Sequence, residues 1–343
     1  MAFFIIIERP WKRIFPWPFL FPFQNKNLES KGGRNFMTTK ILKPVELTPN
    51  FFQLGTHAFP TYLSIGEEGM IIEGGTGPTF QIMIDQIKYL GINIKRIRYI
   101  ILTHTHPDHI GAIPHFQYHY PHIKLLTHPI GAKNLGKKEL FKQFLLVDLG
   151  IAQLMKAKGE IESLPESTKE YYFNVDSVVQ EGDQIDLGSG IIWKIYETPG
   201  HSPCHISLFE EKEKTLIIGD ATGFYVPERD IFWPNYFESL YKYCESIRKL
   251  NTLTAKRAAL SHNGVIEGNI KIHLEKALKA TEKYHYELME RLNRGEIPEK
   301  IALEKARFVE SLTDIQPFKV MYDLCELMIK NSLAHRDNSI FNV

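Results

Sequence analysis

Apolar positions along the chain follow two spacings, one typical of strands and one of helices. The runs FFQLGTH (51–57), RIRYIILTH (96–104) and HIKLLTH (122–128) are short, apolar and bounded by polar or turn residues, which is typical of buried strands. Between the first two, residues 78–90 place apolar side chains at helical spacing. The alternation continues to about residue 268 and predicts an α/β fold.

The pattern changes after Gly268. Residues 269–294 and 316–334 keep helical apolar spacing, with no strand signal between them. We therefore expect an α/β catalytic domain over 37–268 and a C-terminal helical cap over 269–343. Residues 129–172 are also expected to be helical, with breaks at Gly150, Gly159 and Pro165.

The first 36 residues differ from the rest. The stretch MAFFIIIERPWKRIFPWPFLFPF is apolar and aromatic, but its four prolines break any helix and its uninterrupted apolar runs are too short to span a membrane. We expect residues 1–36 to be a disordered or non-native extension before Met37. A weak tether to a membrane surface is the alternative.

Net charge indicates which partners the protein can bind, and cysteine content indicates its cellular compartment. The net charge is +1, and the first 36 residues contribute six basic and two acidic side chains, which leaves −3 for residues 37–343. A body of this sign is a poor match for a phosphate backbone, so we expect no nucleic-acid partner. Three cysteines make no disulfide framework and favour a reduced, cytoplasmic protein with no membrane span.

The segment ILTHTHPDHIGAIPHF (101–116) contains the highest density of possible metal ligands, directly after an apolar run. Alternate side chains of an extended segment share one side, so His104 and His106 are expected to point together. Asp108 and His109 follow in the next turn. Imidazole and carboxylate donors in this pattern suit zinc, iron or manganese, and a solvated loop would not need such density.

Three later positions repeat one arrangement, in which an apolar strand is followed by a small residue and then a polar side chain. They are His201 in YETPGHSPCH, Asp220 in LIIGDATG and His262 in AALSHNG. An aspartate buried after four apolar residues is costly unless it is paired or binds a metal. We therefore expect these three side chains to complete the metal centre. His205 is a candidate to support it from outside.

This set of seven residues resembles the metallo-β-lactamase fold superfamily, which uses H-x-H-x-D-H and then a distant His, Asp and His. The resemblance implies a four-layer αββα sandwich and two divalent ions. It implies that His104, His106 and His201 hold one ion, that Asp108, His109 and His262 hold the other, and that Asp220 bridges them.

Within the superfamily the chain resembles the glyoxalase II-like hydrolases, and more closely the quinolone-signal response type of coenzyme A thioesterase. The shared features are the EGG segment at 73–75 and the GHS..H and GDA.G patterns. The expected function is hydrolysis of a thioester by a hydroxide that bridges the two metals, with Asp108 also collecting its proton. A lactonase and a regulatory protein with a vestigial site remain alternatives. A diiron reductase would need a glutamate in place of His106, and a nuclease fits the charge poorly.

The substrate is expected to be a small acyl compound, and the aromatic segment after Asp220 is the expected wall of its pocket. The candidates in that wall are Phe224, Tyr225 and Trp233, with Tyr322 from the last helix. Packing beneath the cap is the alternative role for the first three, and packing in the core is the alternative for Tyr322. The amphipathic cap would also allow a homodimer.

Overall fold

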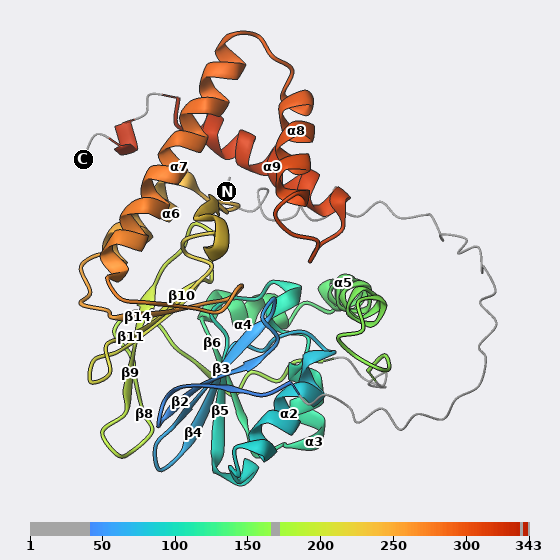
Figure 1. Cartoon of the computed structure of the whole chain (residues 1–343), viewed down its shortest axis with the longest axis vertical. Helices are drawn as coiled ribbons and strands as arrows, with labels where there is room; N and C mark the ends of the chain where they lie inside the picture. The colour runs from blue at the N-terminus through green and yellow to red at the C-terminus, as the bar shows by residue number, and fades with distance from the viewer. Residues whose placement is uncertain (1–41, 166–171, 337–338, 342–343) are drawn as a thin grey trace, which may run out of the picture. The chain divides into compact units, whose positions relative to one another are not determined.

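Two β-sheets stack face to face and carry helices on their outer sides (Figure 1). The computed structural model describes residues 42–165, 172–336 and 339–341. The expected extension over residues 1–36 lies outside these ranges, so it stays a prediction.

The first sheet has seven strands in sequential order. They are β1 (Val45–Thr48), β2 (Phe51–Gly55), β3 (Pro60–Ile65), β4 (Gly69–Ile72), β5 (Ile97–Ile101), β6 (Lys124–Thr127) and β7 (Ser177–Val178). Its first four strands are antiparallel, whereas β4 to β7 run parallel. Parallel neighbours present their carboxyl ends at one edge, and the histidine motif leaves β5 at that edge.

The second sheet has six strands in the order β15-β14-β11-β10-β9-β8. They are β8 (Gln184–Asp186), β9 (Ile192–Glu197), β10 (Ile206–Glu210), β11 (Thr215–Gly219), β14 (Arg257–Leu260) and β15 (Val265–Glu267). β11 and β14 pair in parallel, so the segments after them, which carry Asp220 and His262, leave from the same edge. A small separate ribbon pairs β12 (Phe224–Val226) with β13 (Ile231–Trp233).

Alternate residues of each strand supply different layers of the core. On β3, Tyr62 packs between the sheets and Leu63 packs under the helices, and on β11 Ile217 and Ile218 divide in the same way. This period of two is the pleat of a strand that is covered on both faces. The three resulting apolar layers confirm the αββα sandwich that the sequence predicted.

Helices cover both outer faces. Those of the first sheet are α2 (Thr79–Tyr89), α3 (Ile113–His119), α4 (Pro129–Leu135) and α5 (Lys138–Ala157). Those of the second are α6 (Leu240–Leu250), α7 (Ile270–Asn293), α8 (Pro298–Glu310) and α9 (Phe318–Leu333), of which the last three form the cap. Among the described residues, no helix has the length and hydropathy to cross a membrane.

One local expectation was wrong, and two elements were not predicted. α5 continues through Gly150, because burial of the inner face of the helix outweighs the low helix propensity of one glycine. α8 and β15 were not predicted, and both form where tertiary packing covers a short apolar face. α8 packs extensively against α9, and β15 closes the edge of β14.

Candidate metal centre

The histidine motif is held in place by the segment that follows β4. The short helix η2 (Pro107–His109) closes when the His109 amide donates to the His106 carbonyl at 3.0 Å. The Gly74 amide donates to the His109 carbonyl at 2.9 Å, and the Gly111 amide donates to that of Gly75 at 2.8 Å. A side chain at Gly74 would meet the His109 carbonyl oxygen at 2.5 Å, so this approach requires glycine.

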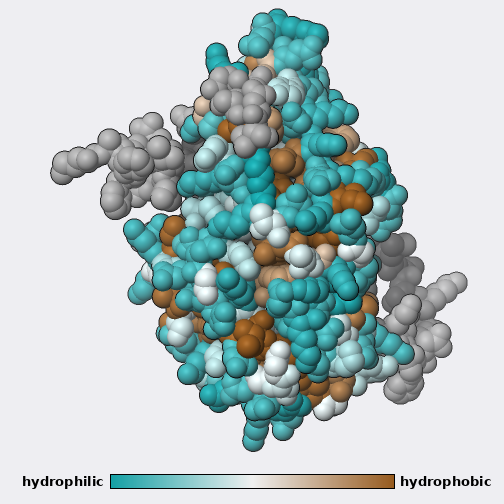
Figure 2. All heavy atoms as spheres, turned by 90° about the vertical axis from the view of Figure 1, so that its left-hand side faces the viewer, coloured by the Kyte–Doolittle hydropathy of each residue, from teal (hydrophilic) through white to brown (hydrophobic). Residues whose placement is uncertain are grey.

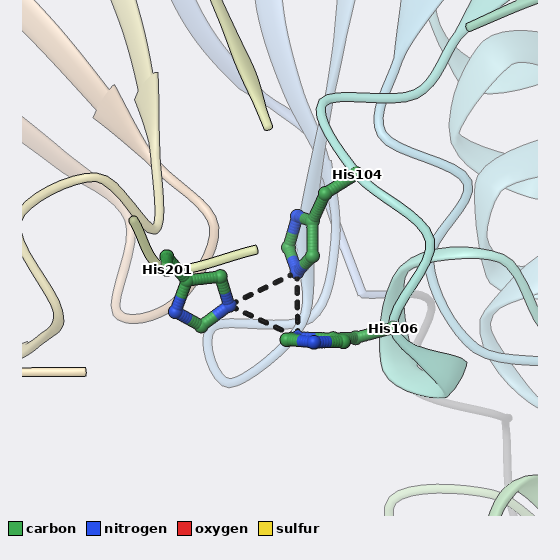
Figure 3. Close-up of side chains that lie close together, drawn as sticks. All are labelled: His104, His106 and His201. Carbon is green, nitrogen blue, oxygen red and sulfur yellow. Dashed lines mark hydrogen bonds between the residues drawn. The ribbon is translucent and has the colours of Figure 1, made fainter. Parts of the chain in front are cut away.

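Three imidazoles converge on one point (Figure 3). His106 Nδ1 lies 3.0 Å from His104 Nε2 and 2.9 Å from His201 Nε2, and the two Nε2 atoms are 3.3 Å apart. Ligand nitrogens around a tetrahedral zinc ion are about 3.3 Å apart when each Zn–N bond is about 2.0–2.1 Å. The spacing therefore suits three lone pairs directed at one cation.

A second group joins the first through Asp220. Asp108, His109 and His262 offer ligand atoms that lie within 4.8 Å of one another. Asp220 Oδ2 is 3.4 Å from Nε2 of both His201 and His109, which belong to different groups. The structure thus brings all seven predicted residues together, with Asp220 between two sets of three.

Hydrogen bonds outside the centre orient its imidazoles. His201 Nδ1 lies 3.0 Å from the Asn235 carbonyl, and His262 Nδ1 lies 2.8 Å from that of Ala58. A carbonyl oxygen can only accept, so each Nδ1 carries the hydrogen and each Nε2 presents a lone pair to the centre. His109 Nδ1 is oriented in the same way, 3.3 Å from Glu73 Oε2.

Glu73 is a supporting residue that the sequence analysis did not assign to the site. Its side chain is 1% exposed, and its Oε1 accepts hydrogen bonds from the hydroxyls of Thr103 (2.6 Å) and Ser261 (2.7 Å). It joins the first sheet, the motif and the second sheet next to His262. The sequence pattern that predicted Asp220 also applies to Glu73, because each of these acidic residues follows an apolar strand.

His205 holds the backbone of Asp220. Its Nε2 accepts the Asp220 amide hydrogen at 2.9 Å, and its Nδ1 lies 2.8 Å from the Thr198 hydroxyl. Burial lowers the pKa of His205 to about 3, so the ring stays neutral and keeps this acceptor. Its expected supporting role rests on these two bonds.

The charges of the centre suit a cation. Burial lowers the pKa of His106 to about 3 and that of His201 to about 4, so both rings keep their lone pairs. Burial alone would raise the pKa of Asp220, but the imidazoles of His262, His109 and His201 hold it well below its usual value. Burial alone would lower the pKa of His109, but the carboxylates of Asp108 and Glu73 raise it well above its usual value, so this ring holds a proton that a metal ion would have to displace.

Two aromatic rings lie beside the candidate ligands. The Phe224 ring lies 5.6 Å from that of His262, and Phe237, between Trp233 and His201, lies 5.2 Å from the His201 ring. Tyr225 packs on His273 of α7 instead. Tyr322 donates to Glu326 on its own helix, so its place in the pocket stays a prediction.

A family model agrees with this fold and with the position of the candidate centre at the edge of the two sheets. The sequence profile described as "Metallo-beta-lactamase superfamily" matches residues 59–262, more than half of the chain. The chain belongs to this superfamily, and members of its fold generally hold divalent metals.

The proteins that the chain resembles include metallo-hydrolases. It is 28% identical over 172 residues to the probable metallo-hydrolase YqjP of Bacillus subtilis (46% of this chain, 51% of that protein). It is 29% identical over 146 residues to the hydroxyacylglutathione hydrolase GloC of Haemophilus influenzae (40% and 55%). The chain thus spans about half the length of these relatives.

A solved structure extends the likeness of the fold. The metallo-β-lactamase family protein TTHA1429 of Thermus thermophilus aligns with a TM-score of 0.58 at 19% identity, covering 85% of this chain and 95% of that one. This likeness shows the fold. The comparisons do not show the closer likeness to the quinolone-signal thioesterases.

Proposed function

We propose that the protein is a dinuclear metal-dependent hydrolase that cleaves a thioester of a small acyl compound. The observation that carries the proposal is the position of Asp220 Oδ2 between two sets of three ligands. His104, His106 and His201 would hold one divalent ion, and Asp108, His109 and His262 the other. Zinc, iron and manganese all accept these donors.

The chain's own residues then prepare the reaction. Two divalent ions, when bound, supply an acidified water and a Lewis acid for the acyl carbonyl. Asp108 Oδ2 lies 3.6 Å from Nε2 of both His109 and His262, so its carboxylate faces the centre and can orient a water and accept its proton. The new C–O bond replaces the C–S bond, and the thiolate leaves to take up a proton.

Support for a thioester comes from two sources. The relative GloC is a hydrolase of hydroxyacylglutathione, in which the acyl group is carried on sulfur. The aromatic rings of Phe224 and Phe237 beside the ligands offer an apolar surface to an acyl group. The coenzyme A or glutathione carrier is left to experiment.

A panel of acyl thioesters and acyl-homoserine lactones tests this function. We expect the wild type, loaded with zinc, iron or manganese, to turn over thioesters faster than lactones. Asp108→Asn is expected to lower kcat/KM about 10²- to 10⁴-fold, the usual contribution of a positioned base. Asp85→Asn, on the exposed side of α2, is the matched control and should retain full activity.

Metal content, measured by mass spectrometry on all three proteins, separates the outcomes. Activity lost in Asp108→Asn with two metals retained supports a role for Asp108 in the reaction. Turnover of lactones alone would replace the thioesterase by the lactonase. No turnover by a wild type that holds two metals would favour the regulatory protein.

A further inference from the structure

α5 carries apolar side chains on two faces, and only one of them is covered. Phe144, Ile151 and Met155 are buried against the body. On the outer side Leu146 is 58% exposed and Leu149 is 39% exposed. Isolated exposed leucines are ordinary, but two of them one turn apart on a surface helix form an apolar strip.

Other exposed apolar side chains lie on segments that are joined to α5 by contacts. Among the described residues, seven of the sixteen exposed large hydrophobic side chains lie within residues 118–178. Contacts join their segments, because Gln117 and Asn174 exchange two hydrogen bonds and the rings of Phe141 and Phe173 lie 5.4 Å apart. The exposed residues next to these contacts include Tyr118 and Tyr172.

The same helix is the centre of a basic segment. Residues 124–158 contain seven lysines and two acidic residues, a net charge of +5, while residues 37–343 as a whole have −3. The rest of that body therefore has −8. Lys138 and Lys142 are exposed and precede Leu146 at four-residue steps, so they lie on the same face of α5.

One acidic residue of α5 does not offset these lysines at the surface. Asp148 faces inward, where its Oδ1 accepts the Gly77 amide hydrogen at 2.6 Å and its side chain is buried. The exposed surface of α5 thus carries lysines beside leucines. This combination is typical of a helix that lies in a membrane interface. On the side shown in Figure 2, apolar residues form several groups that polar residues separate.

We propose that the α5 face (Lys138, Lys142, Leu146 and Leu149), with Tyr118 and Tyr172 on the segments joined to it, docks the protein onto a membrane that contains anionic phospholipids. The lysines complement the headgroups, the leucines enter the boundary of the acyl chains, and tyrosines favour this depth. A nucleic acid would use the lysines but would gain nothing from the leucines. The proposal is independent of the reaction at the metal centre.

Flotation with vesicles tests the proposal on the full chain. We expect binding to vesicles of phosphatidylcholine with about one-third phosphatidylglycerol, and little binding to phosphatidylcholine alone. Lys138→Glu/Lys142→Glu should lower the partition coefficient about 25-fold or more, because each lysine near such a surface contributes roughly fivefold. Leu146→Gln/Leu149→Gln should lower it about tenfold, by loss of apolar burial.

The matched control is Ile272→Gln/Ile297→Gln, which removes two side chains of similar exposure (50% and 62%) on the cap. It should bind vesicles like the wild type, and circular dichroism should show that every variant is folded. Equal binding by all variants, or none by the wild type, would overturn the proposal. Binding to DNA that depends on the lysines and not on the leucines would do so as well. A dimer abolished by the leucine changes would assign the face to a second copy.

Discussion

The two halves of the molecule supply the metal centre in different ways. The first sheet contributes four ligands from one six-residue turn, His104 to His109, whereas the second contributes His201, Asp220 and His262 from three separate strand ends. The first group is positioned by its own backbone and by Gly74. The second depends on the positions of β9, β11 and β14 within one sheet. A local turn can thus carry ligands, but a two-metal centre needs the two sheets to be packed.

Changing the residue that joins the halves should have the largest effect. Asp220→Asn removes a charge that faces Nε2 of both His201 and His109. We expect at least one metal to be lost and kcat/KM to fall about 10³-fold or more, since a metal centre contributes several kcal/mol to the transition state. Metal analysis with steady-state kinetics checks this. Two metals retained at wild-type affinity would show that Asp220 does not bridge the halves.

Removing the metals should loosen the junction between the halves. A ligand that binds only the folded state adds about 4 kcal/mol to the free energy of unfolding at 1,000 times its Kd. We expect dialysis against a chelator to lower the urea midpoint by a corresponding amount, and added zinc or manganese to restore it. Unfolding curves that coincide with and without metal would contradict a centre built from both sheets.

Asp148 of α5 supports the loop after β4 in the first half of the molecule, and its protonation should affect the free energy of unfolding. Burial raises its pKa to about 7, while the unfolded value is near 3.8. The folded protein therefore holds this proton more tightly, and its stability should fall as pH rises from about 4 to about 7. A shift of this size corresponds to at most about 4 kcal/mol. Asp148→Asn should remove that fall, which urea unfolding at several pH values measures. Parallel pH profiles for both proteins would contradict the assignment.

A smaller effect is expected at a hydrogen bond between the sheets. The Tyr62 hydroxyl donates to the Leu260 carbonyl at 2.6 Å and lies 2.9 Å from that of Gly264, on either side of His262. Tyr62→Phe should cost about 1–2 kcal/mol of unfolding free energy, because buried carbonyls lose their donor. The exposed Tyr118→Phe is the control. If the two changes cost the same, this contact does not fasten the halves.

The smallest effect is expected where the cap meets α5. Lys158 and Asp314 form an ion pair at 2.6 Å, but their side chains are 32% and 71% exposed. Water screens such a pair, so Lys158→Ala should change the unfolding free energy by less than about 1 kcal/mol. A double-mutant cycle with Asp314→Ala would measure the coupling. A coupling well above this value would mean that the pair anchors the cap.

The sequence alone predicted most of the elements and the seven candidate metal ligands. Strand periodicity, turn residues and the motif at 104–109 are local patterns, so they can be recognised in the sequence without knowledge of the tertiary structure. His201, Asp220 and His262 were also readable, because each follows an apolar strand that must end at a sheet edge. The same signal stood before Glu73, but nothing local indicated that its carboxylate would orient His109.

Only the tertiary structure decided what surrounds the ligands. The acceptors of His201 and His262 are backbone carbonyls of Asn235 and Ala58, which are remote from them along the chain. The ring of Phe237 meets that of His201, although the two residues are far apart in the sequence. α5 continues through Gly150 because the inner face of the helix is covered. Such contacts depend on how whole sheets and helices pack, and packing free energy is summed over many distant residues, so no local pattern contains it.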